Sequence, residues 1–315
     1  MDYSIFYRRS IGPEKIESEL APCDVFVSAF NSSDRVNGVF GKINSRRKIW
    51  LVHPEYAYAP VELPANGEIV TPEHSDERLQ VETLLGVIGE LAGLDLCIDI
   101  TGFMRHVLAF LIPKLALSGV KSFTALYSEP AAYVNQEGTQ FSTTTTGTVR
   151  PVRGMGGSNH STAADFVVMS VGFDHKLISE VCNHKDSLIV YPLFAFPSLS
   201  PDMYQQSAIR ASQGGDVAQE DRWIANRRFA PANDPFSTAS IVSDIVSEIE
   251  RRGSANIYLA PLSTKVQTLG IALYWHLEGR HHPAISVLLP ECATYSRETS
   301  AGLKRLWAYT VELDL

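Results

Sequence analysis

Two short turns in the sequence place small hydroxyl side chains close to a basic residue. The first reads Asp99-Ile-Thr-Gly-Phe-Met-Arg105, and the second reads Pro261-Leu-Ser-Thr-Lys265. Each follows an apolar run and leads into an apolar segment with helical character, so each should join a strand to a helix. Backbone N–H groups at the start of a helix can bind an anion, and a nearby cation strengthens the attraction. Both turns therefore indicate phosphate binding.

Particular side chains carry this prediction. Arg105 and Lys265 should contact phosphate groups, while Gly102 should let the backbone approach the ligand closely. Other small polar residues complete the predicted ligand-binding set. The two turns contribute Thr101, Ser263 and Thr264, and the segment after the first strand contributes Ser28, Asn31, Ser32 and Ser33. Ordinary capping of the following helices is the alternative interpretation for all of them.

Two glutamates end predicted strands at matching places. Glu129 follows the strand Thr124–Tyr127, and Glu291 follows the strand Ile285–Leu289. A carboxylate at a strand end can hold a ribose hydroxyl group. In an enzyme, Glu129, Glu291 and Asp99 would instead supply acid–base groups. The alternative is that each glutamate simply starts a turn. Two nearby tyrosines could stack on a base or pack in the interior: Tyr133 and Tyr295.

Other groups of polar residues give weaker indications. Trp223 with its neighbouring arginines could clamp phosphates or form a solvated helix: Arg222, Arg227 and Arg228. His106 could be a base, although a histidine on a helix face is more often structural. The histidines near Cys182 and at 281–282 lack further ligands, and no glycine-rich dinucleotide fingerprint follows a strand. The sequence therefore indicates neither a metal nor a cofactor.

The elements that must position these residues recur along the chain. Helices are predicted over 75–93 and 235–253, with Ser75 and Asp234 as N-caps. A shift of 265 − 105 = 160 positions superposes these helices and places Arg105 on Lys265. Because the matches occur in the same order across four elements, they indicate an internal duplication, although any α/β protein repeats strand–helix–strand units.

Each half reads as alternating apolar strands and helices. This alternation predicts an α/β protein of two tandem Rossmann-like lobes, residues 1–157 and 158–315, with mainly parallel sheets covered by helices on both faces. Ligands of such sheets bind beyond the carboxyl ends of the strands, so we expect the two halves to share one pseudo-symmetric cleft there. Residues 198–234 form a long irregular stretch whose role the sequence leaves open, with a short helix expected near 220–228.

The turn Asp99-Ile-Thr-Gly-Phe-Met-Arg105 resembles the strand–Thr-Gly–Lys/Arg loop of CARF domains. CARF domains and the related SAVED sensors are Rossmann-like nucleotide-sensing domains of prokaryotic antiviral systems, and SAVED proteins join two CARF-like units in one chain. The resemblance implies binding of a cyclic oligonucleotide or another nucleotide signal. Phe103 stands where that loop would have a second glycine, and no effector domain is recognisable. If the resemblance holds, it therefore implies that the chain acts on a partner or effector protein or is catalytic itself.

Composition limits the classes of partner. The chain has 27 Lys+Arg against 35 Asp+Glu, a net charge of −8, which argues against general nucleic-acid binding. No basic-then-apolar leader and no apolar run of about 20 residues is present, so we expect a soluble, cytoplasmic protein without a membrane partner. Its four cysteines lie far apart and indicate no disulfide framework.

Three hypotheses of function follow. The first is a sensor or regulatory protein that binds a nucleotide or a related anionic small molecule. The second is a transferase or hydrolase that acts on a nucleotide or nucleotide-sugar in the same cleft. The third is an interaction subunit that docks a partner through residues 198–234.

Overall fold

The computed structural model describes residues 1–133, 142–159, 163–213, 221–295, 297 and 300–314. Within these ranges, the side chains at positions 133, 142–144 and 293–295 lie outside the description. The chain forms two compact units. We call residues 6–139 and 294–315 the N-lobe, and residues 1–5 and 140–293 the C-lobe.

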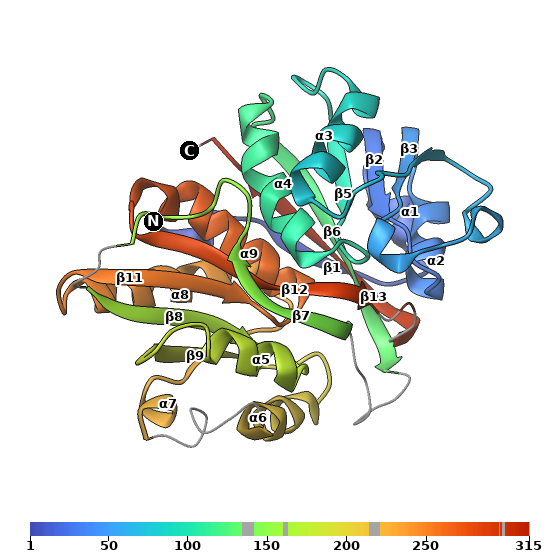
Figure 1. The fold of residues 1–315 in the computed structure, drawn as a ribbon. Coiled ribbons are helices and arrows are strands. Elements are labelled where there is room, and N and C mark those ends of the chain that lie inside the picture. The colour runs from blue at the N-terminus through green and yellow to red at the C-terminus, as the bar shows by residue number, and fades with distance from the viewer. Residues whose placement is uncertain (134–141, 160–162, 214–220, 296, 298–299, 315) are drawn as a thin grey trace. The chain divides into compact units, whose positions relative to one another are not determined.

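In the described part of the N-lobe, seven strands form one sheet in the order β1-β13-β6-β5-β2-β3-β4 (Figure 1). Strands β2 to β6 are mutually parallel, whereas β13 is antiparallel to both of its neighbours. The elements are β1 (Arg8–Ile11), α1 (Ile16–Glu19), β2 (Cys23–Ala29), α2 (Asp34–Lys42), β3 (Ser45–Leu51), β4 (Glu68–Val70), α3 (Glu77–Ile88), β5 (Leu96–Asp99), α4 (Arg105–Leu117), β6 (Ser122–Tyr133) and β13 (Ser300–Glu312), with short 3-10 turns at η2 (Pro54–Tyr56) and η3 (Pro60–Glu62).

In the described part of the C-lobe, six strands form a second sheet in the order β10-β9-β8-β11-β12-β7. Strands β8 to β12 are mutually parallel. The elements are η1 (Tyr3–Ile5), β7 (Ser142–Pro151), β8 (Ala164–Val171), α5 (His175–Cys182), β9 (Ile189–Ala195), α6 (Met203–Gln213), α7 (Asp221–Ala225), β10 (Arg228–Ala230), α8 (Pro235–Glu250), β11 (Ala255–Pro261), α9 (Lys265–Leu277), η6 (Gly279–His281) and β12 (Ile285–Tyr295).

The parallel parts of the two sheets have the same strand order. It is β4-β3-β2-β5-β6 in the N-lobe and β10-β9-β8-β11-β12 in the C-lobe, counted from one edge. In chain order this is 3-2-1-4-5, the order of a Rossmann-like, doubly wound sheet. The predicted α/β class with mainly parallel sheets is therefore confirmed.

One strand of each predicted half lies in the sheet of the other lobe. β13 pairs with β6 over most of its length, and Figure 1 shows the two strands running side by side. β7, which follows β6 along the chain, lies beside β12 in the C-lobe. Nothing in the sequence pattern indicated this exchange, because an apolar strand carries no sign of which neighbour it will pair with.

Helices cover both faces of the N-lobe sheet. Phe40 of α2 stacks on Trp50 of β3, with ring centroids 3.6 Å apart, in a buried cluster that also contains Phe26 of β2. Since side chains alternate along a strand, the buried Val25 and Val27 point to the opposite face. There α3 and α4 pack against each other, as Figure 1 shows.

Some predicted boundaries differ from those of the structure. Helix α3 begins after Asp76, whose carboxylate accepts from two backbone N–H groups, and not after the predicted cap Ser75. It ends at Ile88, because Gly89 has a positive φ of 87°. The predicted Asp234 cap of α8 is confirmed.

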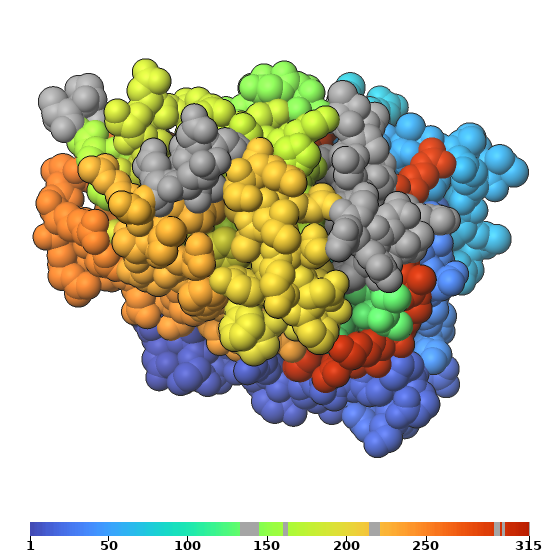
Figure 2. Space-filling view, turned by 90° about the horizontal axis from the view of Figure 1, so that it is seen from below, coloured from blue at the N-terminus to red at the C-terminus, as the bar shows by residue number. Residues whose placement is uncertain are grey.

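The irregular stretch 198–234 contains more structure than expected. The expected short helix is α7, and the longer helix α6 was not predicted. Figure 2 shows α6, in yellow, on the surface of the C-lobe. Residues 214–220 lie outside the described part.

Candidate functional site

The carboxyl ends of β2 and β5 bring two predicted residues together. Ser28 lies directly opposite Asp99 in the parallel register, and its hydroxyl group donates to the Asp99 carboxylate at 3.1 Å. The Thr101 backbone N–H donates to the other carboxylate oxygen at 3.0 Å. Ser28 and Asp99 are both fully buried. Burial raises the pKa of Asp99, although its hydrogen bonds to Thr101 and Ser28 and the charge of Arg35 oppose the increase.

Thr101 connects this pair to β6. Its hydroxyl oxygen accepts from the Ser128 backbone N–H at 2.9 Å. The three strand ends β2, β5 and β6 are thus joined through one set of hydrogen bonds. Ser28, Asp99 and Thr101 hold the turn in shape through these bonds, and the predicted contacts of Ser28 and Thr101 with a ligand stay predictions.

Gly102 stands where two loops meet. A Cβ atom at this position would lie 2.0 Å from the Ala29 carbonyl oxygen, so no other residue fits without moving the backbone. Gly172 after β8 makes the corresponding contact in the C-lobe, where a Cβ atom would lie 2.1 Å from the Leu262 carbonyl oxygen. Packing of the loops accounts for both glycines.

Arg105 and Lys265 occupy equivalent positions in the two lobes. Each is the first residue of a 13-residue helix, α4 or α9, and each is half-buried. Thr264 caps α9 by accepting from the Gln267 backbone N–H at 3.1 Å, and the Ser263 backbone N–H donates to Ser170 at 3.2 Å. Both basic residues thus stand where a strand-to-helix turn enters its helix, and their predicted contact with phosphate stays a prediction.

The start of α2 holds a basic residue that the sequence analysis missed. The Arg35 guanidinium group donates to the Ser128 carbonyl oxygen and lies 6.0 Å from the centre of the Tyr127 ring. Arg35 is in the first turn of a helix that follows a parallel strand, as Arg105 is. This pattern, a basic residue in the first turn of a helix after a parallel strand, could have identified Arg35 from the sequence.

Buried polar atoms around Arg35 lack hydrogen-bond partners. Among the described residues, they are Ser33 Oγ, Arg35 Nε and Ser128 Oγ. Ser128 is fully buried and Ser33 is 7% exposed. In the C-lobe, the fully buried Gln267 likewise has no partner for either side-chain amide atom within the described chain. Native proteins rarely leave such atoms unpaired without water or a ligand.

Tyr56 lies within electrostatic range of Arg35 and Arg105. Burial and its neighbours Tyr58 and Glu55 raise the pKa of Tyr56, while the charges of Arg105 and Arg35 oppose the increase. Both cations therefore act on the same phenol group.

Asn31 and Ser32 shape the chain before α2. The Asn31 side-chain oxygen accepts from the Ser33 backbone N–H at 3.0 Å, and the Ser32 backbone N–H donates to the Tyr58 hydroxyl group at 3.1 Å. Ser33 occupies the N-cap position without a capping hydrogen bond from its side chain. Asn31 therefore orders this turn and leaves Ser33 Oγ unpaired.

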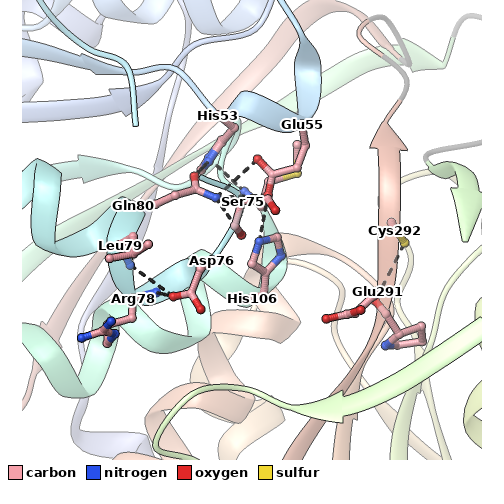
Figure 3. Close-up of polar contacts among 12 residues, drawn as sticks. His53, Glu55, Ser75, Asp76, Arg78, Leu79, Gln80, His106, Glu291 and Cys292 are labelled. Atoms are coloured by element: carbon pink, nitrogen blue, oxygen red, sulfur yellow. Dashed lines mark hydrogen bonds and ion pairs between the residues drawn. The ribbon is translucent and has the colours of Figure 1, made fainter. Parts of the chain in front are cut away.

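A buried chain of hydrogen bonds runs beside this region (Figure 3). His53 Nε2 accepts from the Met104 backbone N–H at 3.2 Å, so its Nδ1 carries the proton and donates to Gln80 at 2.6 Å. Gln80 donates to the Glu55 carboxylate at 3.1 Å, and His106 Nε2 lies 3.0 Å from the same carboxylate. Of these residues, sequence reasoning singled out only His106.

The Glu55 carboxylate is 97% buried but remains ionised. Its side chain is 3% exposed, and that of His106 is 14% exposed. Burial alone would raise the pKa of Glu55, but the hydrogen bond from His106 and the electrostatic interactions with His53 and His106 lower it below its usual value. Glu55 and His106 therefore form an ion pair or a strong hydrogen bond at the start of α4.

The carboxylates of Glu129 and Glu291 both form ion pairs with basic side chains. β6 continues to Tyr133, so Glu129 lies inside a strand, contrary to the expected turn. Its carboxylate contacts Lys304 at 2.8 Å and accepts from the Trp307 indole N–H at 2.7 Å. Glu291 in β12 pairs with Arg150 of β7 at 2.5 Å. Their predicted roles in hydroxyl binding or acid–base chemistry remain predictions, and the Tyr133 and Tyr295 side chains lie outside the described part.

The residues of the basic cluster near Trp223 contact other side chains of the protein. Trp223 is buried against Phe194, and the Arg227 guanidinium group lies 5.3 Å from the centre of the same ring. Arg228 pairs with Glu248 at 2.7 Å. The cluster packs α7 against the sheet.

No metal-ligand cluster or membrane-spanning helix is found in the described residues, and no family model or curated protein matches the chain. In the described ranges, no three His, Cys, Asp or Glu side chains come together as metal ligands would. Nor does any helix there have the length and apolar character needed to cross a membrane. Comparison with models of known protein families finds no match, and comparison with curated proteins finds none.

Proposed function

We propose that the protein is a sensor or regulatory protein that binds a nucleotide or a related anionic small molecule at the carboxyl ends of its parallel strands. Arg105 and Lys265 contact phosphate groups, as the sequence predicted, and Arg35 joins them. The resemblance of the Asp99–Arg105 turn to CARF and SAVED domains supports a nucleotide signal and a role in antiviral defence.

The observation that carries the proposal is the set of unpaired polar atoms around Arg35. Ser33 Oγ, Arg35 Nε and Ser128 Oγ are buried, and within the described residues they have no partner. Leaving a buried polar group unpaired costs about 1–3 kcal/mol. Phosphate oxygens would accept from all three groups, and the charges of Arg35 and Arg105 would offset those of the ligand.

A second turn of the same design supports the proposal. In the C-lobe, Lys265 and the unpaired amide of Gln267 lie in the first turn of α9. The shared strand order, and the pairing of Glu129 and Glu291 with basic residues on the neighbouring strand, support an internal duplication. Each lobe would then carry an anion site of the same design.

Calorimetric titration tests the proposal. Inorganic phosphate, pyrophosphate, mononucleotides and cyclic oligonucleotides form the panel. Loss of a hydrogen bond to a charged group costs about 1.5–3 kcal/mol, so Arg35→Ala and Arg105→Ala with Lys265→Ala should each weaken binding at least about tenfold. Arg46→Ala, at a side chain that is 85% exposed, is the matched control and should bind normally. Absence of binding, or unchanged binding in the variants, contradicts the proposal.

An enzyme is the second candidate, favoured by the Glu55–His106 pair. A buried carboxylate that orients a partly exposed histidine is an arrangement suited to general acid–base catalysis. His106 directly follows Arg105. Recovery of every nucleotide of the panel unchanged after long incubation excludes this candidate. Turnover that is lost in His106→Gln and kept in the exposed-site control His74→Gln supports it.

A further inference from the structure

Two cysteines line one pocket at the opposite, amino ends of the N-lobe strands. The pocket has a volume of about 450 Å³. Cys23 at the start of β2 and Cys97 in β5 both contribute to its wall, together with Arg9, Asp95 and Tyr309. The proposed phosphate site uses none of these residues.

The backbone places both cysteines on the same side of the sheet. The backbone N–H groups of Asp24 and Val25 both donate to the Asp95 carbonyl oxygen, at 2.9 and 3.3 Å. Two residues of β2 thus oppose the residue that precedes β5, as in a β-bulge, which changes the side to which the residue before the bulge points. Cys97 belongs to the buried cluster under α2, and Cys23 packs against that cluster.

The two thiols differ in exposure and acidity. Cys97 is 6% exposed, whereas Cys23 is partly open to solvent. A hydrogen bond with Cys97 lowers the pKa of the Cys23 thiol, in spite of burial and the nearby Asp24 and Asp95. The same hydrogen bond, with burial, raises the pKa of Cys97. Cys23 is therefore the more acidic and the more exposed of the two thiols, as an attacking sulfur should be, and Cys97 stays protonated.

We propose that Cys23 and Cys97 form a redox-sensitive dithiol, in which a peroxide that enters the pocket oxidises Cys23 and Cys97 then closes a disulfide. The structure shows both cysteines as free thiols. The closed bond would join the start of β2 to β5.

The chemistry balances with a hydroperoxide as the oxidant. The Cys23 thiolate attacks one peroxide oxygen, the O–O bond breaks, and the departing oxygen leaves as hydroxide and becomes water. The Cys97 sulfur then attacks the sulfenic acid of Cys23, forming the S–S bond and releasing a second water. Two thiols are oxidised by two electrons, and one hydrogen peroxide is reduced to two waters.

The proposal is tested by exposing the full chain to hydrogen peroxide and counting the free thiols that remain. After a brief exposure, the number of free thiols should fall by two from the four of the sequence, and peptide mapping should find Cys23 linked to Cys97. In Cys97→Ala, the sulfenic acid of Cys23 should persist and be trapped by dimedone. Cys292→Ser, which removes another partly exposed cysteine, should behave like the unaltered protein.

Three results would overturn the proposal. The first is retention of all four thiols at peroxide concentrations that oxidise free cysteine. The second is reaction at Cys23 without linkage to Cys97 in the unaltered chain, and the third is a disulfide that involves Cys182 or Cys292. The linkage is mapped in the unaltered protein, so the proposal remains testable if Cys97→Ala fails to fold.

Discussion

At the scale of single residues, the candidate site depends on how buried polar groups are paired. Glu55 is held between Gln80 and His106, and its carboxylate is ionised because these contacts outweigh its burial. Around Arg35, by contrast, hydroxyl and guanidinium atoms are left unpaired. Paired groups build the scaffold, and the unpaired groups of Ser33, Arg35 and Ser128 support the proposed anion site.

Glu55→Gln should reduce stability at neutral pH by about 1–3 kcal/mol, because the amide cannot accept from every donor that now faces the carboxylate. The folded-state pKa of Glu55 lies below its ordinary value of 4.5, so its contribution is fully present above that value. It is lost as the pH falls through the lowered pKa.

Urea unfolding over a pH series checks this expectation. The unaltered protein should lose more stability than Glu55→Gln between neutral and acidic pH, so the two curves should converge. Glu73→Gln, at an exposed glutamate, provides the control and should follow the unaltered protein. Parallel curves for Glu55→Gln and the unaltered protein would show that Glu55 makes no such contribution.

At the scale of elements, the strand ends and the helices that follow them position the site. Sequence reasoning predicted that the turns carrying Arg105 and Lys265 join strands to helices, because apolar runs and small polar residues mark those boundaries locally. It missed the His53–Gln80–Glu55 chain, because these side chains come from the start of η2 and from α3 and meet only in the folded lobe. It also missed the continuation of β6 through Glu129, since a charged residue within an apolar strand looks like the end of that strand.

Gly102→Ala should destabilise the N-lobe by at least about 1–3 kcal/mol, the usual cost of overpacking, because its Cβ atom would overlap the Ala29 carbonyl group. Gly38→Ala is the matched control. Position 38 lies inside α2 with nothing within 4 Å of a new Cβ atom, so this change should stabilise by about 0.5–1 kcal/mol. Thermal unfolding of both variants measures the difference, and equal effects would mean that the loop contact at Gly102 yields easily.

At the scale of the whole molecule, the two sheets share a strand order and exchange their last strands. Periodicity predicted the alternation of strands and helices, and hence the α/β class. Strand pairing depends on contacts between distant residues, so the exchange of β7 and β13 could not be predicted in the same way. That residues 1–157 and 158–315 are two duplicated lobes therefore stays a prediction.

Separated halves should fold poorly. A fragment of residues 1–157 lacks β13, so the N-lobe sheet loses the partner of β6 and the basic residues that pair with Glu129. Co-expression with residues 158–315 should restore a stable complex. Circular dichroism and co-purification of the fragments measure both effects. A cooperative unfolding transition in the first fragment alone would show that β13 is dispensable.

The exchange of β13 also sets the order of events during synthesis. β6 is complete once the ribosome has made residue 133, but its partner follows only with residues 300–312. Contacts between residues so far apart slow folding, and until they form, β6 is a sheet edge open to pairing with other chains. The charge of Glu129, later neutralised by Lys304, would protect that edge from aggregation while the rest of the chain is made.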